Sequence, residues 1–334
     1  MKKILFLTFV AAILLFSCAK PNKPFTPTES NLKTVNFYPT TGYARDFSIL
    51  KNHLFVAEDQ SGFAIFDLNS DTLIIHFTEN IQNARLISAV ERDTTSTLVV
   101  YDTFGGPASL MLYDISDVSN PILFSNIIEN TGGIETMVAS VVNDTLNISL
   151  SRNSSGTHEF KISELIQIYG QWFLSELLTN SNFDYDVHNF SENNGKYYIG
   201  NEQNGIAVLD EESGDIQEYI DTPGSAYDVK KSDNYLFVAD RHEGFEVYKA
   251  DTKEMIYHYD TSGYAKQLEI NDKYAVVASG GGGIYVFDIS NPEEVSLIGR
   301  IDDSEIGYTY KAKIVNDKIF VATRNGVYEL GVNN

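Results

Sequence analysis

The sequence of 334 residues predicts an all-β protein built from seven four-stranded units, and three observations lead to this prediction. A phrase of alternating apolar residues, in most copies followed by Asp, recurs seven times along the chain. The composition, with 20 Tyr and 20 Phe, suits the half-buried pleated surface of strands. The segment YPTTGYA at 38–44 returns 221 positions later as YDTSGYA at 259–265, which suggests that the two ends of the chain share one structural unit.

The recurring apolar phrase sets the number and the length of the units. The last apolar residue of each copy stands at Phe66, Tyr113, Phe160, Leu209, Tyr248, Phe287 and Leu330. Successive copies are therefore 47, 47, 49, 39, 39 and 43 residues apart. Repeats of about 40–50 residues are typical of propellers. The third unit departs from the pattern, because Lys161 takes the place of the Asp.

Each unit contains three further short strands around this phrase. A strongly apolar segment such as NYLFVAD (234–240) precedes it, and a shorter one such as YDVKKS (227–232) comes earlier still. A fourth segment such as EVSLIGRID (294–302) follows it. Four short strands joined by tight turns are the signature of a propeller blade. The stretch 163–178 comes nearest to a helical period, but unit three needs its turn and outer strand there.

The two ends of the chain are expected to complete one blade together. The seventh unit runs out at Asn334 directly after its third strand, whereas KTVNF (33–37) has the character of a fourth strand without a unit of its own. Joining them leaves no open sheet edge at the seam. We therefore predict a seven-bladed β-propeller over residues 33–334, in which the N-terminal strand closes the last blade.

The first 32 residues have the features of an export signal and a tether. Lys2 and Lys3 precede an uncharged stretch, Ile4–Phe16, which suits a secretory signal and is too short to span a bilayer. It ends in LFSC (15–18), which resembles the bacterial lipoprotein signal, in which the Cys receives acyl chains such as palmitate. This predicts a signal peptide over 1–17, lipid attachment at Cys18 and a proline-containing tether over 18–32. The expected location is the cell envelope, on the periplasmic side of an outer membrane.

The charge balance excludes one class of partner. With 46 Asp and Glu against 24 Lys and Arg, the formal net charge is −22, which repels the phosphate backbone of nucleic acids. The single cysteine excludes an intrachain disulfide. We expect a monomer that contacts the membrane through the lipid on Cys18 alone.

Two segments carry a resemblance to a known family. GGIYVFDISNP (282–292) and LMLYDISDVSNP (110–121) resemble the LVIVD repeat, which builds β-propellers in exported or lipid-anchored bacterial proteins. The resemblance extends over the chain from about Lys33 and is weakest in unit three. It implies a propeller fold, an exported location and a binding role, and it supplies no catalytic residues to transfer to this sequence.

Candidate ligand-binding residues follow from the expected geometry of the blades. If the first strand of each blade lines a central channel, its entry residues converge on one face together with the turns between second and third strands. The candidates are Arg45, Asp46, Arg85, Glu135, Asp186, His188, Asp228, Asp240, Arg241, His242, Lys266 and Lys311. The entries of the first strands and the turns between second and third strands also contain Gln267, Tyr310, Glu58, Asp59, Asp102, Arg152, Asn201, Glu202 and Arg324. The alternative is that these groups pair with one another and with turn amides.

No catalytic set, metal site or cofactor site is predicted. The six histidines have no metal-ligand spacing, and the aspartates at the ends of the repeats, such as Asp67 and Asp288, are expected to accept hydrogen bonds from turn amides. We expect a non-enzymatic binding module for a protein, peptide or glycan. One alternative is a hydrolase or lyase for polysaccharide or peptide that uses Asp186, Asp228 and Asp240. Another is an adhesive role, which a large exposed apolar patch would indicate.

Overall fold

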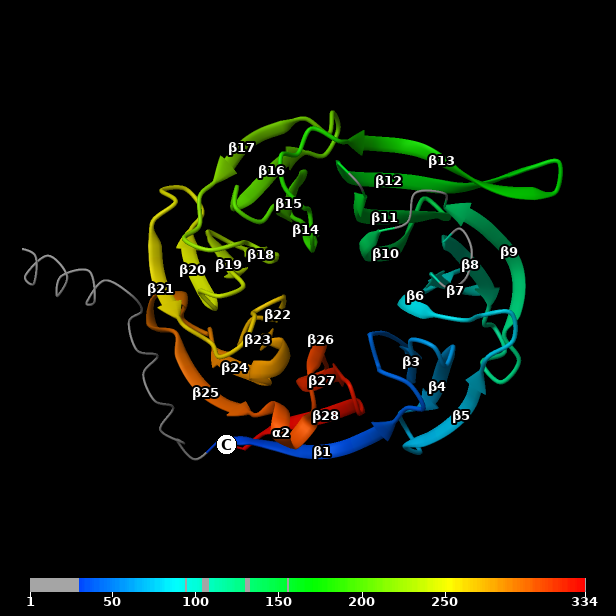
Figure 1. Ribbon diagram of the computed structural model, residues 1–334, viewed down its shortest axis with the longest axis horizontal. Helices are drawn as coiled ribbons and strands as arrows, with labels where there is room; N and C mark the ends of the chain where they lie inside the picture. Colours follow the sequence, from blue (N-terminus) through cyan, green and yellow to red (C-terminus); the bar gives the residue numbers. More distant parts are fainter. Residues whose placement is uncertain (1–29, 94, 104–107, 130–132, 155, 334) are drawn as a thin grey trace, which may run out of the picture. The chain divides into compact units, whose positions relative to one another are not determined.

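The computed structural model describes residues 30–93, 95–103, 108–129, 133–154 and 156–333. The predicted signal peptide, Cys18 and nearly all of the predicted tether lie outside these residues. The described residues from Leu32 to Val332 form seven four-stranded antiparallel sheets arranged in a ring, as Figure 1 shows. The predicted seven-bladed β-propeller is therefore confirmed. Among the described residues, no helix is long and apolar enough to cross a membrane.

Each blade runs from an inner strand to an outer strand in chain order. Blade one consists of β2 (Asp46–Leu50), β3 (His53–Ala57), β4 (Phe63–Asp67) and β5 (Thr72–Phe77). Blade two consists of β6 (Ala84–Arg92), β7 (Thr95–Asp102), β8 (Ala108–Asp114) and β9 (Ile122–Glu129). Blade three consists of β10 (Ile134–Val142), β11 (Thr145–Ser154), β12 (Thr157–Ile168) and β13 (Gln171–Asn180). Blade four consists of β14 (Phe190–Glu192), β15 (Lys196–Gly200), β16 (Ile206–Asp210) and β17 (Ile216–Ile220). Blade five consists of β18 (Asp228–Ser232), β19 (Tyr235–Ala239), β20 (Phe245–Lys249) and β21 (Met255–Tyr259). Blade six consists of β22 (Gln267–Ile270), β23 (Tyr274–Ala278), β24 (Ile284–Asp288) and β25 (Ser296–Ile301).

The seventh blade joins the two ends of the described chain. It contains β26 (Thr309–Val315), β27 (Lys318–Thr323) and β28 (Gly326–Val332), and β1 (Leu32–Pro39) is its outer strand. β1 pairs antiparallel with β28 from Leu32↔Val332 to Pro39↔Gly326. The predicted closure of the ring is thus confirmed.

The aspartates that end the third strands hold the following turns. Asp67 Oδ1 accepts hydrogen bonds from the amides of Asn69 and Ser70 at 2.7 and 3.3 Å, and Asp288 Oδ1 accepts one from Ser290 at 2.9 Å. Asp114 and Asp210 bind turn amides in the same way, so the predicted role is confirmed. In blade three, where Lys161 stands at this position, β12 continues to Ile168 and forms a long hairpin with β13. The stretch 163–178 is strand, turn and strand, as predicted.

The hydrophobic core lies between neighbouring blades. One cluster joins Phe63 and Ile65 of blade one to Leu98 and Tyr113 of blade two, and the Phe63 and Tyr113 rings meet edge to face at 5.4 Å between centroids. Because the β-branched and aromatic side chains of the two middle strands are buried on both faces, each sheet packs against the sheet on either side. Within the described residues, helix is confined to α2 (Asp303–Ile306) and two short 3-10 turns, η1 (Gly280–Gly282) and η2 (Pro292–Glu294). η1 lies between β23 and β24.

Candidate functional site

The entry positions of the inner strands form a ring of seven side chains, one from each blade. These are Arg45, Arg85, Glu135, His188, Tyr227, Lys266 and Tyr310, and all seven line a cavity of about 580 Å³. Each stands within two residues of the start of an inner strand, next to a small or apolar residue that is buried. Arg85 and Glu135 are exposed, His188 is buried, and the other four are partly buried. The repeat therefore places one side chain of each blade at the mouth of the channel.

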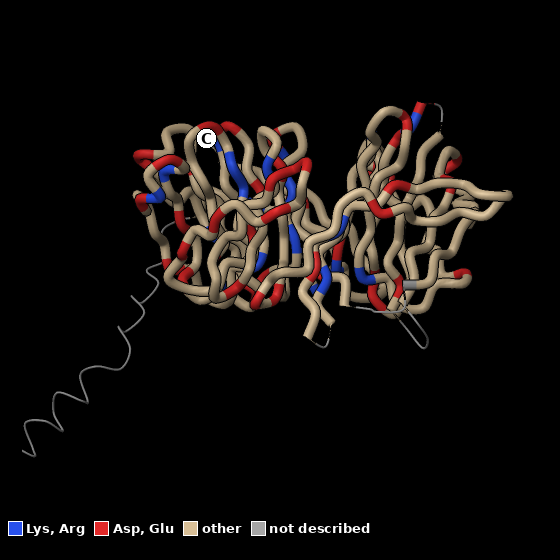
Figure 2. The backbone as a smooth tube through the Cα atoms, turned by 90° about the horizontal axis from the view of Figure 1, so that it is seen from above, with Lys and Arg blue, Asp and Glu red and all other residues tan. Residues whose placement is uncertain are grey.

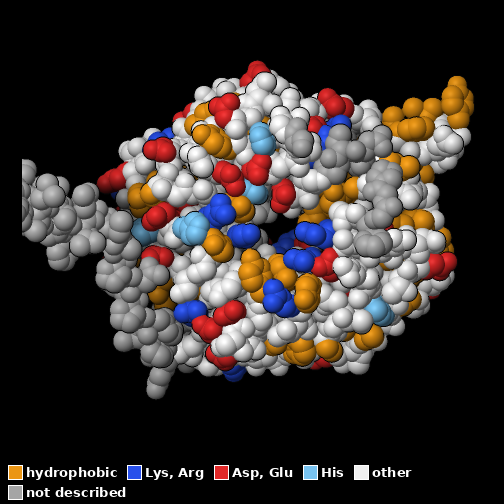
Figure 3. Space-filling view, viewed as in Figure 1, with side chains coloured by type: hydrophobic (Ala, Val, Ile, Leu, Met, Phe, Trp, Pro, Cys, Tyr) orange, Lys and Arg blue, Asp and Glu red, His pale blue; other side chains and the backbone are white. Residues whose placement is uncertain are grey.

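Tyrosines form a second part of the cavity wall. Tyr43 and Tyr308 come from the turns that lead into blades one and seven, and Tyr101 comes from β7. With Tyr227 and Tyr310 they give the cavity five phenol rings. Figure 3 shows Lys and Arg side chains gathered around the central opening, beside apolar and aromatic groups. The wall thus offers both flat ring faces and positive charge.

The charge of the cavity is opposite in sign to that of the whole chain. Its lining contains five cations, namely Arg45, Arg85, Lys266, Lys311 and Arg324, and two carboxylates, Asp46 and Glu135. By contrast, Asp and Glu are spread over both faces of the ring (Figure 2), and the formal net charge of the chain is −22. A local excess of positive charge in an acidic protein attracts anions to this mouth.

Three of the five cations have no ion pair within the described part of the chain. Arg45 Nε binds Asp59 Oδ2 at 2.8 Å, and Lys311 is paired with Asp46. Arg85, Lys266 and Arg324 have no carboxylate partner among the described residues. Burial lowers the pKa of Lys266, and the nearby positive charge of Arg241 lowers it further, against the attraction of Glu135. Burial and the neighbouring Arg241 thus both disfavour the charged form of Lys266.

The tyrosine rings hold several of these cations in place. The Arg45 guanidinium lies 4.7 Å from the Tyr310 ring centroid, and Arg324 lies 5.3 Å from that of Tyr43. Lys266 Nζ lies 5.5 Å from the Tyr227 ring. Cation–π contacts of this kind orient a cation without neutralising its charge. The cations remain available to a negatively charged group.

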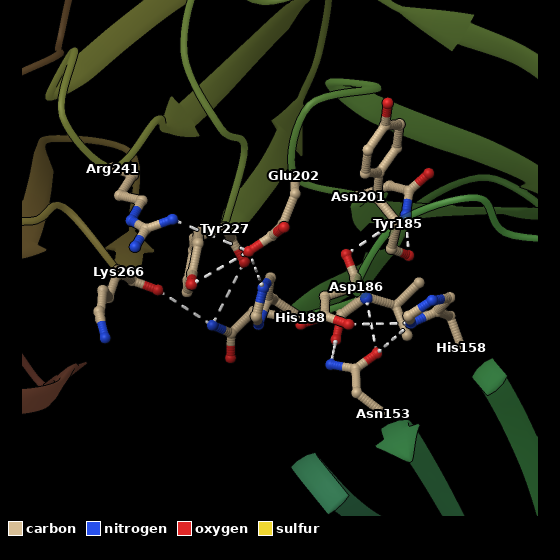
Figure 4. A network of polar contacts seen from close by, with 12 residues as sticks. Asn153, His158, Tyr185, Asp186, His188, Asn201, Glu202, Tyr227, Arg241 and Lys266 are labelled. Atoms are coloured by element: carbon tan, nitrogen blue, oxygen red, sulfur yellow. Dashed lines mark hydrogen bonds and ion pairs between the residues drawn. The ribbon is translucent and has the colours of Figure 1, made fainter. Parts of the chain in front are cut away.

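A polar network centred on Glu202 lies on one side of the mouth, as Figure 4 shows. Glu202 Oε1 lies 3.3 Å from His188 Nε2 and accepts a hydrogen bond from the Tyr227 hydroxyl at 3.3 Å. Arg241 Nη1 lies 3.9 Å from the same oxygen. The hydrogen bond to His188 is the main reason that the pKa of Glu202 lies below its usual value. The His188 ring also stacks on Tyr227 at 3.7 Å between centroids, so the network fixes both side chains at the cavity wall.

The same network contains three groups with metal-ligand chemistry. Asp186, His188 and Glu202 each offer one ligand atom, and these atoms lie within 4.8 Å of one another. Asp186 Oδ1 is also 2.9 Å from His158 Nδ1. A cation there would have to displace the contacts of Glu202 with Tyr227 and Arg241, and the Arg241 charge opposes such a cation. Asp186, His188 and Glu202 are therefore better suited to hydrogen bonds and ion pairs within this network than to binding a metal ion.

The structure brings seven of the twelve predicted binding residues together at the cavity. These are Arg45, Asp46, Arg85, Glu135, His188, Lys266 and Lys311. Asp186 and Arg241 instead belong to the network beside it, and the His242 ring packs edge to face against Tyr264 at 4.5 Å.

Asp228 and Asp240 are buried structural groups, which corrects their assignment to the binding face. Asp228 Oδ2 accepts a hydrogen bond from the Leu268 amide of the next blade at 2.9 Å, and Oδ1 binds Lys230 at 2.9 Å. Asp240 accepts hydrogen bonds from the Gly224 amide and the Thr222 hydroxyl. Both aspartates are fully buried. Neither carboxylate has access to a substrate, so the acidic residues suggested for a hydrolase or lyase do not come together at the mouth.

Sequence reasoning missed most of the tyrosines that line the cavity. Tyr43, Tyr101, Tyr227 and Tyr308 were outside the predicted set, which favoured charged side chains. A signal for Tyr43 was present, because the repeated segment GYA places a tyrosine three residues before the inner strand. Tyr227 stands at the same repeat position as Arg45 and Lys266, and an alignment by position instead of by charge would have included it.

Comparisons with known proteins agree with this architecture. A profile described as the LVIVD repeat matches residues 41–72, 223–247 and 262–303. The solved structure of the computationally designed Ika8 protein is similar with a TM-score of 0.64 at 9% identity, over 89% of this chain and 98% of that one. Raptor of Chaetomium thermophilum is similar with a TM-score of 0.65 at 11% identity, over 90% of this chain and 28% of the Raptor chain. At such identities these two structures support the fold alone.

No curated protein sequence matches the chain. The three matched stretches fall on blades one, five and six, where the apolar strand, the glycine and the turn follow one another most regularly. The chain accordingly carries LVIVD repeats in these three blades, and its described residues form a seven-bladed β-propeller.

Proposed function

We propose that this protein is a non-enzymatic binding module of the cell envelope, which takes an anionic peptide or glycan at the mouth of its propeller channel. The observation that carries the proposal is the cavity of about 580 Å³, in which Arg85, Lys266 and Arg324 have no ion pair within the described residues. Charged groups are normally paired when they converge in a pocket, because converging like charges repel. A bound anion would supply the missing counter-charge.

The tyrosines of the cavity favour a ligand with flat or partly apolar faces. Sugar rings and peptide side chains pack against phenol faces, while the phenol hydroxyls form hydrogen bonds with polar groups. Burial raises the pKa of Tyr227 to about 12, so its hydroxyl keeps its proton at neutral pH and can donate. An acidic oligosaccharide or a Glu-rich peptide matches this combination of positive charge and aromatic surface.

The envelope location rests on the N-terminal sequence. The leader with Lys2, Lys3 and an apolar stretch ends at Cys18, the single cysteine of the chain. An acylated Cys18 would hold the propeller at the outer membrane on its periplasmic side, since two or more acyl chains anchor a protein stably.

Titration calorimetry with defined probes tests the binding proposal. The probes are an oligogalacturonate, a Glu-rich peptide and a neutral cello-oligosaccharide of similar length. We expect an anionic probe to bind and the neutral one not to, with affinity that falls as salt rises because the charges are screened. The triple variant Arg85→Gln, Lys266→Gln, Arg324→Gln should bind at least ~10-fold more weakly, which corresponds to about 1.4 kcal/mol.

Lys253→Gln is the matched control. It also removes a positive charge, but Lys253 lies outside the cavity lining and pairs with Glu218 at 3.0 Å. This variant should bind as the wild type does. Equal affinity for neutral and anionic probes, or an unchanged affinity in the triple variant, would exclude an anion site at the mouth.

A further inference from the structure

The hairpin of blade three extends beyond the rim of the ring, as Figure 1 shows. β12 has 12 residues and β13 has 10, and β13 is the longest of the seven outer strands in the described chain. The outer strands of blades four and five, β17 and β21, have five residues each. In blade three, Lys161 stands at the Asp position and β12 continues past it to Ile168.

The tip of this hairpin is apolar and uncharged. Residues 165–175, LIQIYGQWFLS, contain no charged side chain, although 21% of the whole chain is charged. Tyr169 at the turn is fully exposed, and Ile168, Phe173 and Leu177 are between 44% and 53% exposed. Apolar side chains at the tip stand out in orange at the edge of the face shown in Figure 3.

The apolar surface continues onto blade two. The Phe124 ring of β9 meets Trp172 of β13 at 5.6 Å between centroids. Ile122 and Phe124 are 56% and 36% exposed. We call Ile122, Phe124, Ile168, Tyr169, Phe173 and Leu177 the rim patch.

β13 also presents a free sheet edge. Within its sheet β13 pairs with β12 alone, so one row of its backbone amides and carbonyls faces outward. A long apolar edge of this kind is a template for another strand, and proteins usually blunt such edges with charges or shorten them. β13 carries a single charged residue, Glu176, and neither device is present in its uncharged stretch, Gln171–Ser175.

We propose that the rim patch is a homodimer interface, in which β13 pairs antiparallel with β13 of a second copy. An antiparallel edge pair around a two-fold axis is self-complementary, because the same strand contributes both halves. The pairing joins the third blades of two propellers into one continuous sheet and brings the two rim patches together. It involves no residue of the channel mouth and leaves the binding cavity open.

The exposed area fits a stable dimer. With about 200 Å² for a fully exposed large side chain, the exposed fractions of the rim patch correspond to roughly 700 Å² per copy. Each partner in a stable interface contributes about 800 Å². The high negative charge of each copy opposes the association, and salt screens this repulsion. Dimerisation is therefore expected to strengthen as salt rises, which is the opposite of the dependence expected for anion binding.

Sedimentation velocity on the full-length chain with Cys18→Ser, which removes the acylation site, tests the proposal. We expect a concentration-dependent monomer–dimer equilibrium that shifts toward the dimer at high salt. Phe173→Lys should weaken the dimer at least ~10-fold, because each copy then places a charge in an apolar interface. Its melting temperature should stay close to the wild-type value, since Phe173 is 44% exposed and belongs to none of the clusters that form the hydrophobic core.

Leu73→Lys is the control for Phe173→Lys, and two single-cysteine variants test directly whether β13 pairs with β13. Leu73 is 53% exposed on β5 of blade one, so its replacement should leave the dimer intact. In the Cys18→Ser background, Ser175→Cys near the middle of β13 should form an intermolecular disulfide, whereas Gln217→Cys on β17 should not. A chain that stays monomeric at every concentration and salt, or a dimer that Phe173→Lys leaves unchanged, would overturn the proposal.

Discussion

Glu246 shows how a buried side chain ties the stability of this propeller to pH. It lies fully buried on β20, its Oε2 accepts a hydrogen bond from the Tyr248 hydroxyl, and its Oε1 has no hydrogen-bond partner within the described residues. Burial raises its pKa to about 8, and the hydrogen bond from Tyr248 opposes part of that increase. Asp240 lies close by, and burial raises its pKa to about 6.

The raised pKa of Glu246 makes the folded state lose stability as pH increases. Below the usual glutamate pKa of 4.5, both the folded and the unfolded state hold the proton and stability is not reduced. Between pH 4.5 and 8 the unfolded chain releases the proton first, so the free energy of unfolding decreases. Glu246→Gln removes this dependence. We expect the wild type to lose on the order of 5 °C more in melting temperature between pH 5 and 9 than the variant does.

Glu212→Gln provides the comparison for this measurement. Glu212 is exposed in the turn between β16 and β17, so its replacement should leave the pH dependence of the melting temperature unchanged. Asp240 titrates in both the wild type and Glu246→Gln, so the difference between them reports Glu246 together with its charge interaction with Asp240. Parallel melting curves for wild type and Glu246→Gln across the pH range would refute a protonated Glu246.

At the scale of the element, β1 closes the ring. Tyr38 and Leu32 are buried, and the Tyr38 hydroxyl donates to Asp71 at 2.8 Å on the neighbouring blade. Without β1, β28 becomes an exposed edge and the apolar cluster shared by blades seven and one is opened.

Deletion of residues 31–39 should therefore lower the melting temperature by at least ~10 °C. Circular dichroism during thermal unfolding measures this directly. Deletion of residues 19–29, which precede the closing strand, should have no such effect. If the two deletions melt alike, β1 does not stabilise the ring as its pairing with β28 indicates.

For the whole molecule, attachment to the membrane is predicted to depend on one atom, the sulfur of Cys18. Cys18→Ser should move the protein from the membrane fraction to the soluble fraction of an expressing cell, because acyl chains are the expected anchor and the acidic surface repels anionic lipids. The melting temperature should not change, since Cys18 precedes the folded domain that starts at Asn31. A variant that stays with the membranes after a high-salt wash would contradict the lipoprotein prediction.

The blade count and the ring closure could be predicted from the sequence because the contacts of a propeller blade are local. Each strand pairs with the strands next to it in the chain, with β1 as the exception, so a repeat in the sequence becomes a sheet in the structure. The chain begins with a fourth strand that belongs to no unit of its own, and its last unit lacks a fourth strand. These two observations together predict how the ring closes. The Asp of each repeat could also be assigned, because it binds amides two or three residues away.

The tertiary structure decided which side chains form the site. Neighbouring residues of a strand point in opposite directions, so Tyr227 faces the cavity while Asp228 is buried against the next blade. Two residues next to each other in the sequence can therefore have different roles, one at the cavity wall and one in the core. Whether a side chain is charged does not reveal which role it has. The cations that have no ion pair among the described residues, and the rim patch, likewise depend on distances between residues of different blades, which a single sequence does not give.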